Sequence, residues 1–221
     1  MRQQSTQQVT VRGAVIGGPR AVICLPLVGD TREKVLQEAA EFVALQPDLL
    51  EWRIDAYGGV ENREDCLSLL HELRHVIADI PLIFTCRIDV EGGFKEIARQ
   101  NRLDLFTAAM VTGYVDIVDI ELCNEKEFID SVLARAKKSG VKVILSYHNF
   151  IETPSKPFIY AKLAAAQTAG ADIAKLAVMP RNYGDVLTLL SATNKARNEV
   201  VECPIVTMSM GPEGVVSRLA G

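Results

Sequence analysis

The feature that most constrains the fold is a regular alternation of short apolar runs with longer segments of helical pattern. Seven runs rich in β-branched residues are predicted strands, at 21–27, 49–54, 81–87, 115–122, 141–147, 172–178 and 204–210. Six segments between them are predicted helices, at 31–46, 61–78, 94–112, 124–139, 155–169 and 183–198. Strict alternation of this kind predicts parallel strands joined by right-handed crossovers.

Two α/β architectures fit the alternation, an open doubly wound sheet and a (β/α)8 TIM barrel. Strand side chains alternate between two faces, so Glu51, Arg53 and Asp55 are expected on one face of their strand. The run at 115–122 repeats this pattern with Asp119 and Glu121. An open sheet covered by helices should be apolar on both faces, whereas a barrel interior can become polar near its mouth. The charged faces therefore favour the barrel.

The number of strands departs from that of a complete barrel. Such barrels have eight strands, typically in about 250 residues, whereas this sequence of 221 residues shows seven. The eighth strand and helix are therefore expected to be absent here, and the native protein is expected to contain them. Residues 1–14 are interpreted as a loose segment, and residues 15–221 as one barrel domain that is incomplete at its C-terminal end.

Composition and charge exclude several classes of protein. The net charge of −4 at pH 7 argues against a nucleic-acid-binding surface. No apolar run approaches the roughly 18–20 residues of a membrane span, and the N-terminus lacks the apolar core of a signal peptide. The five cysteines are scattered and form no C-x-x-C pair, which suggests reduced thiols. A soluble cytoplasmic protein is the expectation.

Lys175 places a charged side chain inside the apolar run at 172–178. Charged groups are almost never fully buried unless they are paired or used. A buried lysine suits Schiff-base chemistry on a ketone or aldehyde, because the attacking amine must be neutral and burial lowers its pKa. Carboxylates such as Glu51 or Asp119 would act in the opposite direction, and the sequence leaves the balance open. A histidine such as His148 is suited to move a proton next to the imine.

Further residues of possible function follow the ends of the predicted strands, where the active sites of such barrels lie. They are Arg87, Glu91, His148, Met208, Met210 and Arg218. Each has a structural alternative when taken alone: ion pairing for the arginines, a hydrogen-bonded strand end for His148, and core filling for the methionines. Their joint placement favours one site at the mouth of the barrel.

Six motifs in this order resemble the type I 3-dehydroquinate dehydratases, the Schiff-base dehydratases of the shikimate pathway. The motifs are LLEWRID (49–55), IFTCR with EGG (83–87 and 91–93), VDIELC (118–123), ILSYHNF (144–150), DIAKLAVMP (172–180) and TMSMGPEGVVSRLAG (207–221). The resemblance runs from about residue 15 to the last residue. It implies dehydration of 3-dehydroquinate to 3-dehydroshikimate in aromatic amino acid biosynthesis, by a homodimer that needs no metal or cofactor.

The resemblance also implies roles for individual residues. Lys175 would form the imine with the substrate ketone, His148 would serve as general base and acid, and Glu91 would orient His148. The residues implied to bind the substrate are Glu51, Arg53, Arg87, Met208, Met210 and Arg218, of which the last would hold its carboxylate. The residues implied to lie beneath them are Asp55, Asp119 and Glu121.

The sequence departs from the family pattern in three places. Cys86 stands where phenylalanine is usual, and Cys24 stands near the usual place of a serine. The eighth strand and the lid loop, from which relatives supply a serine and a glutamine, have no counterpart in residues 1–221.

Three other interpretations stay open. The segment HELRH (71–75) matches the zinc-protease motif H-E-x-x-H, although His71 and His75 are expected on the flank of an outer helix, away from the mouth. A class I aldolase would share the barrel and the lysine, and would usually need a phosphate-binding loop. A barrel of seven strands has two unpaired edges, so the chain could also be an inactive binding module.

Overall fold

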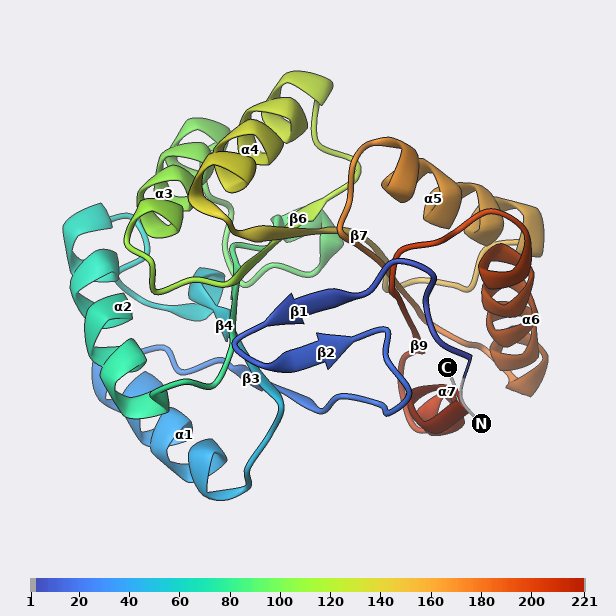
Figure 1. Cartoon of the computed structure of the whole chain (residues 1–221), viewed down its shortest axis with the longest axis horizontal. Coiled ribbons are helices and arrows are strands. Elements are labelled where there is room, and N and C mark those ends of the chain that lie inside the picture. The colour runs from blue at the N-terminus through green and yellow to red at the C-terminus, as the bar shows by residue number, and fades with distance from the viewer. Residues whose placement is uncertain (1–2, 221) are drawn as a thin grey trace.

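The computed structural model describes residues 3–220, in which a curled parallel sheet is surrounded by helices (Figure 1). The seven strands of the sheet lie side by side in chain order, and every neighbouring pair is parallel. The strands are β3 (Cys24–Leu27), β4 (Leu49–Arg53), β5 (Leu82–Thr85), β6 (Ile117–Glu121), β7 (Lys142–Asn149), β8 (Ile173–Val178) and β9 (Ile205–Ser209). The predicted strands and their parallel order are confirmed.

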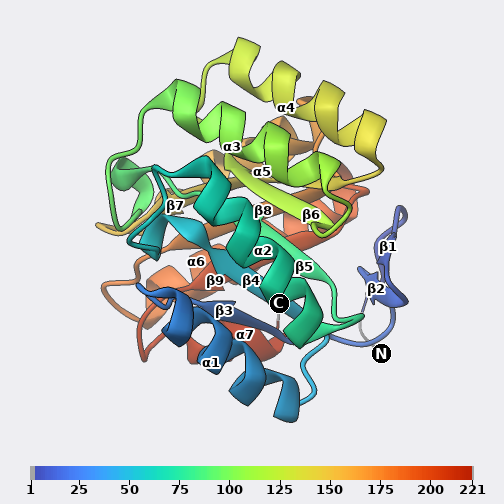
Figure 2. The same ribbon diagram turned by 90° about the vertical axis from the view of Figure 1, so that its left-hand side faces the viewer.

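Six helices cover the outer side of the sheet, and Figure 2 shows α2 on the outer surface between α1 and α3. They are α1 (Arg32–Ala44), α2 (Arg63–Ile77), α3 (Arg99–Val111), α4 (Lys126–Ser139), α5 (Lys156–Thr168) and α6 (Tyr183–Glu199). The side chains of Thr31, Asn62 and Asn182 cap the first turns of α1, α2 and α6. A seventh, short helix, α7 (Val215–Ala220), follows β9. No helix within residues 3–220 is long and apolar enough to cross a membrane.

The sheet forms an incomplete barrel of the (β/α)8 type, as the sequence predicts. Within residues 3–220, β3 and β9 are the two edge strands and do not pair with one another. Pro26 lies in β3, where the missing N–H of proline is tolerated because the strand has a free edge. Each of the other five strands is hydrogen-bonded on both sides, which fixes its register.

The core between the sheet and the helices contains a chain of buried aromatic side chains. Trp52 of β4 meets Phe84 of β5 edge-to-face, with ring centroids 5.6 Å apart. Phe84 meets Phe106 of α3 at 5.8 Å, and Phe106 meets Phe128 of α4 at 6.4 Å. Edge-to-face pairs stabilise by roughly 0.5–1.5 kcal/mol beyond their burial, so this chain fixes α3 and α4 against the central strands.

A second apolar cluster closes the end of the barrel opposite the mouth. One inward-facing side chain from each central strand contributes to it: Leu49, Ile83, Ile117, Ile144 and Ile173. A hairpin of β1 (Val9–Val11) and β2 (Ala14–Ile16) lies across this end (Figure 1) and buries Val9, Val11 and Ile16 in the cluster. The hairpin and this cluster therefore close the end of the barrel formed by the N-terminal ends of its strands.

The expectation of a loose segment over residues 1–14 was wrong for its second half. β1 and β2 pair in an antiparallel hairpin across the two-residue turn of Arg12 and Gly13, which have φ values of 41° and 85°. Two positive φ values are typical of the tight hairpin turns whose twist matches that of the strands. The signal was the dipeptide R-G between two short apolar runs, VTV and AVI.

Candidate active site

Polar side chains fill the barrel interior above the apolar layer. The strand registers place Thr85 beside Asp119, Ser146 beside Glu121, and Lys175 beside Ser146. Inward-facing residues recur at every second position of a strand. Each successive inward-facing side chain therefore lies closer to the C-terminal end of its strand, which is at the mouth. The alternation predicted from the sequence thus holds for the charged residues of β4, β6 and β8, but not for Asp55, which lies beyond the end of β4.

Lys175 is held by two carboxylates. Its Nζ lies 2.7 Å from Oδ2 of Asp119 and 3.7 Å from Oε1 of Glu51, and its side chain is 12% exposed. Burial alone lowers the pKa of Lys175, but the charges of Asp119 and Glu51 outweigh burial and leave the pKa above its ordinary value. On the question that the sequence left open, the two carboxylates favour the ammonium form of Lys175 in the free protein.

Asp119 is fully buried and has contacts from three sides. Besides Lys175, Arg87 lies 2.9 Å from its Oδ2, and the hydroxyl of Ser146 donates to its Oδ1 at 2.6 Å. Arg87 in turn donates to the Ser146 hydroxyl at 2.7 Å. Burial raises the pKa of Asp119, but Arg87 and Lys175 outweigh it and hold that pKa far below its usual range. Asp119 therefore stays ionised beside the lysine.

Glu121 joins two buried arginines. Its Oε1 lies 2.8 Å from Nη1 of Arg87, and its Oε2 lies 2.6 Å from Nη2 of Arg102. Arg102 belongs to α3 and also donates to the backbone carbonyl of Cys86 at 3.1 Å. The sequence analysis missed Arg102. Its signal was a single charge on the buried stripe of α3, in helical spacing with Leu105 and Phe106.

His148 and Glu91 form a pair at the mouth. Oε2 of Glu91 accepts the backbone N–H of His148 at 2.8 Å and lies 3.0 Å from its ring Nδ1. Burial raises the pKa of Glu91 to about 7, whereas burial and the charges of Arg87 and Lys175 lower the pKa of His148 to about 2. Below about pH 7 the pair therefore holds its proton on Glu91, and the imidazole of His148 stays neutral.

This pair gives a test through the pH dependence of stability. In the unfolded chain His148 binds a proton below about pH 6.5 and Glu91 only below about pH 4.5, while the folded pair keeps one proton on Glu91. Between pH 4.5 and 6.5 the folded and the unfolded pair each hold one proton, so the pair does not make the free energy of unfolding depend on pH. Glu91→Gln should make stability fall as the pH drops below 6.5, because folded His148 resists protonation. His148→Phe should make stability rise as the pH drops from 7 to 4.5.

The expected slopes are at most about 1.4 kcal/mol per pH unit, of opposite sign in the two variants. Urea denaturation at intervals from pH 4.5 to 7 measures them as differences from the wild-type curve, which removes the contribution of all other groups. Two variant curves that run parallel to the wild-type curve would contradict the assignment of the proton to Glu91.

The loop after β5 holds Arg53 and Asp55 in place. Arg53 donates to both carboxylate oxygens of Asp55, at 3.0 and 2.8 Å, and to the carbonyl of Gly92 at 3.2 Å. Asp55 also accepts the backbone N–H groups of Arg87 and Phe94, at 3.2 and 3.1 Å. Contrary to the prediction, Asp55 lies beyond β4, in the 3-10 turn η1 (Ile54–Ala56), because the strand ends at Arg53. Asp55 is thus a buried support for two arginines and the loop.

Gly92 allows this loop to approach Phe150. Gly92 has a φ of 85°, and a Cβ added to it would lie 2.3 Å from the Phe150 ring. That ring stacks against His148 with centroids 6.5 Å apart. An alanine here would strain the backbone and displace an aromatic ring that contacts the histidine.

We expect Gly92→Ala to lower the free energy of unfolding by about 2–3 kcal/mol, as the sum of backbone strain and overpacking. Gly140→Ala is the matched control, since Gly140 has a similar φ of 70° but open space around it, and should cost about 1–2 kcal/mol. The double variant Gly92→Ala/Phe150→Ala should recover the overpacking component. Urea denaturation of all three variants measures these differences, and equal costs at Gly92 and Gly140 would contradict them.

The remaining predicted residues lie on the last strand and helix. Met208 is in β9 beside Ala177 of β8, and Met210 follows the strand, with its N–H bonded to the carbonyl of Val178 at 2.8 Å. Arg218 is exposed on α7. In the part of the chain that the structure describes, no hydrogen bond or ion pair joins Arg218 to the charged cluster around Lys175.

Cysteine and hydroxyl side chains add to the site in ways that the sequence analysis did not predict. Thr85 donates to Glu51 at 2.7 Å, which directs that carboxylate toward Lys175. Burial and the neighbouring Glu91 raise the pKa of the Cys123 thiol to about 12. Cys24 lies exposed on the edge strand β3. These residues have no charge, so only their position on inward-facing strand ends or adjacent loops could have indicated them.

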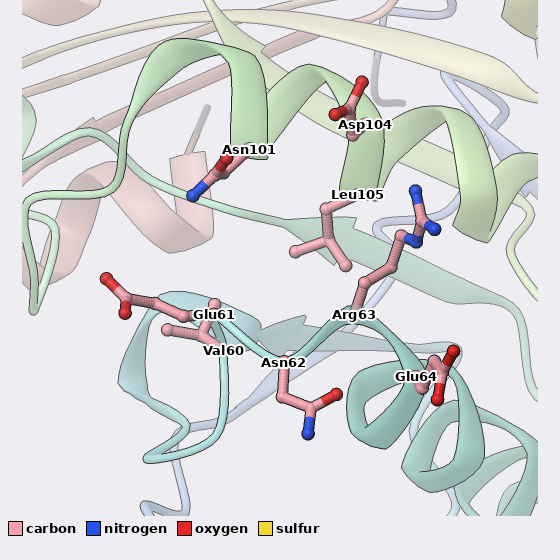
Figure 3. A pocket seen from close by; sticks show the side chains of 8 residues that line it. All are labelled: Val60, Glu61, Asn62, Arg63, Glu64, Asn101, Asp104 and Leu105. Carbon is pink, nitrogen blue, oxygen red and sulfur yellow. The ribbon is translucent and has the colours of Figure 1, made fainter.

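Two surface hollows lie away from this cluster. One lies between residues 60–64 at the start of α2 and Asn101, Asp104 and Leu105 of α3, on the outer side of the barrel (Figure 3). The other lies at the closed end, beside the turn of the β1–β2 hairpin. Neither hollow contains a residue that the sequence analysis placed at the site.

The cluster at the mouth combines three chemical functions. Lys175 is a nucleophile that needs only to lose a proton, the neutral imidazole of His148 can act as a base, and Arg53 and Arg87 present cationic groups near the mouth. His148 lies on the strand next to Lys175, one inward-facing position closer to the mouth than Ser146, the residue that pairs with Lys175. The arrangement suits chemistry on a carbonyl compound that has an acidic C–H next to the carbonyl group.

Comparisons with known proteins give one consistent result. The family model described as type I 3-dehydroquinase matches residues 23–221. A relative from Clostridioides difficile named 3-dehydroquinate dehydratase is 44% identical over 215 residues, covering 97% of this chain and 84% of the relative. A relative of the same name from Aromatoleum aromaticum is 43% identical over 218 residues, covering 98% of this chain and 84% of the relative.

Solved structures show the same similarity in three dimensions. A type I 3-dehydroquinate dehydratase from Clostridium difficile, described as having covalently modified comenic acid, superposes with a TM-score of 0.95 at 44% identity, covering 97% of this chain and 85% of that one. A 3-dehydroquinate dehydratase from Geobacillus kaustophilus superposes with a TM-score of 0.95 at 40% identity, covering 98% and 84%.

Proposed function

This chain belongs to the type I 3-dehydroquinase family, and from that premise we propose that it dehydrates 3-dehydroquinate to 3-dehydroshikimate through an imine on Lys175. The observation that carries the proposal is the buried Lys175, with Asp119 at 2.7 Å, at the mouth of a barrel that also presents His148. The proposed enzyme is a hydro-lyase, and its own lysine supplies the electron sink.

The first step is imine formation. The Lys175 ammonium gives up a proton, and its free amine attacks the C3 carbonyl of the substrate, with loss of one water molecule. The protonated imine carries the same positive charge as the ammonium that it replaces. Asp119, which is fully buried and ionised, is therefore placed to stabilise both forms, and so is Glu51.

The second step is elimination. The iminium withdraws electrons from C2, which makes the C2 proton acidic. Above about pH 7, where Glu91 is ionised and accepts Nδ1–H, Nε2 of neutral His148 is free to take that proton. Glu91, which faces Nδ1 at 3.0 Å, stabilises the imidazolium that forms. The enamine then expels the C1 hydroxyl, which leaves as water with the proton from His148. Hydrolysis of the product imine consumes one water molecule and restores Lys175, so the net reaction releases one.

The proposed binding residues surround these groups. Glu51, Arg53 and Arg87 would contact the hydroxyl groups of the substrate and shape the site, and Met208 and Met210 would face its ring. Arg218 would pair with its carboxylate, for which the two N–H groups of a guanidinium are well suited. Asp55, Asp119 and Glu121 would hold the arginines and the lysine from beneath. The homodimer and the cytoplasmic location stay predictions of the sequence analysis.

Reductive trapping tests the proposal. The protein is incubated with 3-dehydroquinate and borohydride, which reduces an imine to a stable amine, and is then digested for peptide mass spectrometry. We expect one adduct, on the peptide that contains Lys175, and loss of activity in proportion to its formation. The other lysine peptides serve as internal controls. Formation of 3-dehydroshikimate with no adduct on Lys175, or with the adduct on another lysine, would contradict the mechanism.

A further inference from the structure

Two histidines lie side by side on the outer face of α2, away from the barrel mouth. His71 and His75 are four positions apart in the helix, so their side chains leave it on the same side. Both are exposed, because the opposite face of α2 carries the buried residues Leu69, Leu70 and Leu73. Their ring centroids are 4.3 Å apart, with an angle of 58° between the planes.

Hydrogen bonding sets the orientation of the second imidazole. Nδ1 of His75 lies 2.8 Å from the backbone carbonyl of His71. A carbonyl oxygen can only accept, so Nδ1 carries the hydrogen and Nε2 of His75 keeps its lone pair free. Metal-binding histidines are commonly fixed in this way, with the second ring nitrogen bonded to a carbonyl or carboxylate. The His71 ring is held separately by an edge contact with Tyr114, at 5.4 Å between centroids.

The acidic residue among the three between the histidines is engaged elsewhere. Glu72, the glutamate of the H-E-x-x-H pattern, forms an ion pair with Arg32 of α1. It is thus engaged at the contact between the two helices, where it cannot serve as the general base of a zinc protease. Among residues 3–220, no group of three or more histidine, cysteine or acidic side chains could hold a metal ion. Any ion at this pair would keep its remaining coordination positions for water.

We propose that His71 and His75 form a two-histidine chelate for a divalent first-row transition ion on the outer face of α2. Neutral imidazole is a preferred ligand of Zn²⁺, Ni²⁺ and Cu²⁺. Zinc–nitrogen bonds are about 2.0–2.1 Å long, so one ion can reach a nitrogen of each of two rings that are already in contact. The site is independent of the catalytic cluster, because both ligands are exposed and belong to α2, an outer helix of the barrel (Figure 2).

The test uses Ni²⁺ as the probe, on the full chain purified without an affinity tag, at a fixed pH of about 7.5, because metal affinity depends on pH. The protein has three histidines in all, so each imidazole proton signal in an NMR spectrum can be assigned with single variants. Paramagnetic Ni²⁺ should broaden the signals of His71 and His75 together, at one equivalent, and leave that of the buried His148 sharp. Calorimetric titration gives the affinity and the stoichiometry.

Single variants distinguish a chelate from two independent imidazoles. In a chelate, His71→Ala and His75→Ala each lower the affinity by on the order of tenfold or more, because one imidazole remains, and the double variant loses binding at this site altogether. Independent imidazoles would instead lose half of the stoichiometry at unchanged affinity in each single variant, which would overturn the proposal. Broadening of His148 before the other two would overturn it as well. All variants should dehydrate 3-dehydroquinate at the wild-type rate, so the outcome does not depend on the proposed mechanism.

Discussion

Lys175→Met is expected to lower the rate of 3-dehydroquinate dehydration by on the order of 10⁴-fold or more, which is the scale of removing a catalytic nucleophile. Methionine has nearly the length of lysine but no amine, so no imine can form and the C2 proton keeps the weak acidity of a proton next to a ketone. Asp119 keeps its contacts with Arg87 and Ser146, so the rest of the cluster stays in place. The spectroscopic assay of 3-dehydroshikimate formation measures this loss.

Two matched variants serve as controls. One keeps the positive charge of Lys175 but cannot form an imine, and the other removes a lysine far from the site. Lys175→Arg keeps a positive charge beside Asp119, but a guanidinium is not deprotonated in proteins and forms no imine. It should be as inactive as Lys175→Met. Lys142→Met removes a lysine that pairs with Asp172 at 3.1 Å, at the start of β7 near the closed end, and should leave the rate unchanged. Substantial activity in Lys175→Arg would show that the charge matters rather than the amine.

The lysine also shows where the sequence argument reached its limit. An apolar run around Lys175 suggested that burial would lower its pKa, and burial does act in that direction. Two carboxylates from different strands reverse the balance, because Asp119 and Glu51 converge on Nζ. The distance between residues 56 or 124 positions apart cannot be read from a sequence. In the proposed reaction, Lys175 must therefore lose a proton before it attacks, and that step belongs to the kinetic barrier.

What the sequence does predict follows from local periodicity. Glu51 and Arg53 are two positions apart, as are Asp119 and Glu121, so the alternation of strand side chains places each pair on one face. Both pairs lie inside the barrel. The hairpin at Arg12 and Gly13 was missed, because its two strands have only three residues each and Val15 interrupts the alternation of the second. Arg102 comes from a helix outside the sheet, and its contact with Glu121 depends on how α3 packs against β5 and β6.

Glu121→Gln is expected to have the largest effect on stability, a loss of about 3–5 kcal/mol in the free energy of unfolding. The carboxylate is fully buried between Arg87 at 2.8 Å and Arg102 at 2.6 Å. Glutamine keeps the shape and one accepting oxygen but removes the charge that compensates two buried guanidinium groups. Glu125→Gln is the matched control, because Glu125 pairs with Arg99 on the surface, with both side chains more than half exposed, and should cost less than about 1 kcal/mol.

A double variant tests the physical cause. If the loss in Glu121→Gln comes from uncompensated buried charge, then removing one of the two cations should offset part of it. Glu121→Gln/Arg102→Met should therefore be less destabilised than the sum of the two single variants, by roughly 1–3 kcal/mol in a urea denaturation cycle. Arg87 is left unchanged in this cycle because it retains Asp119 at 2.9 Å. Strict additivity would mean that the two residues act through packing alone, since packing losses at each side chain need not depend on the charge of the other.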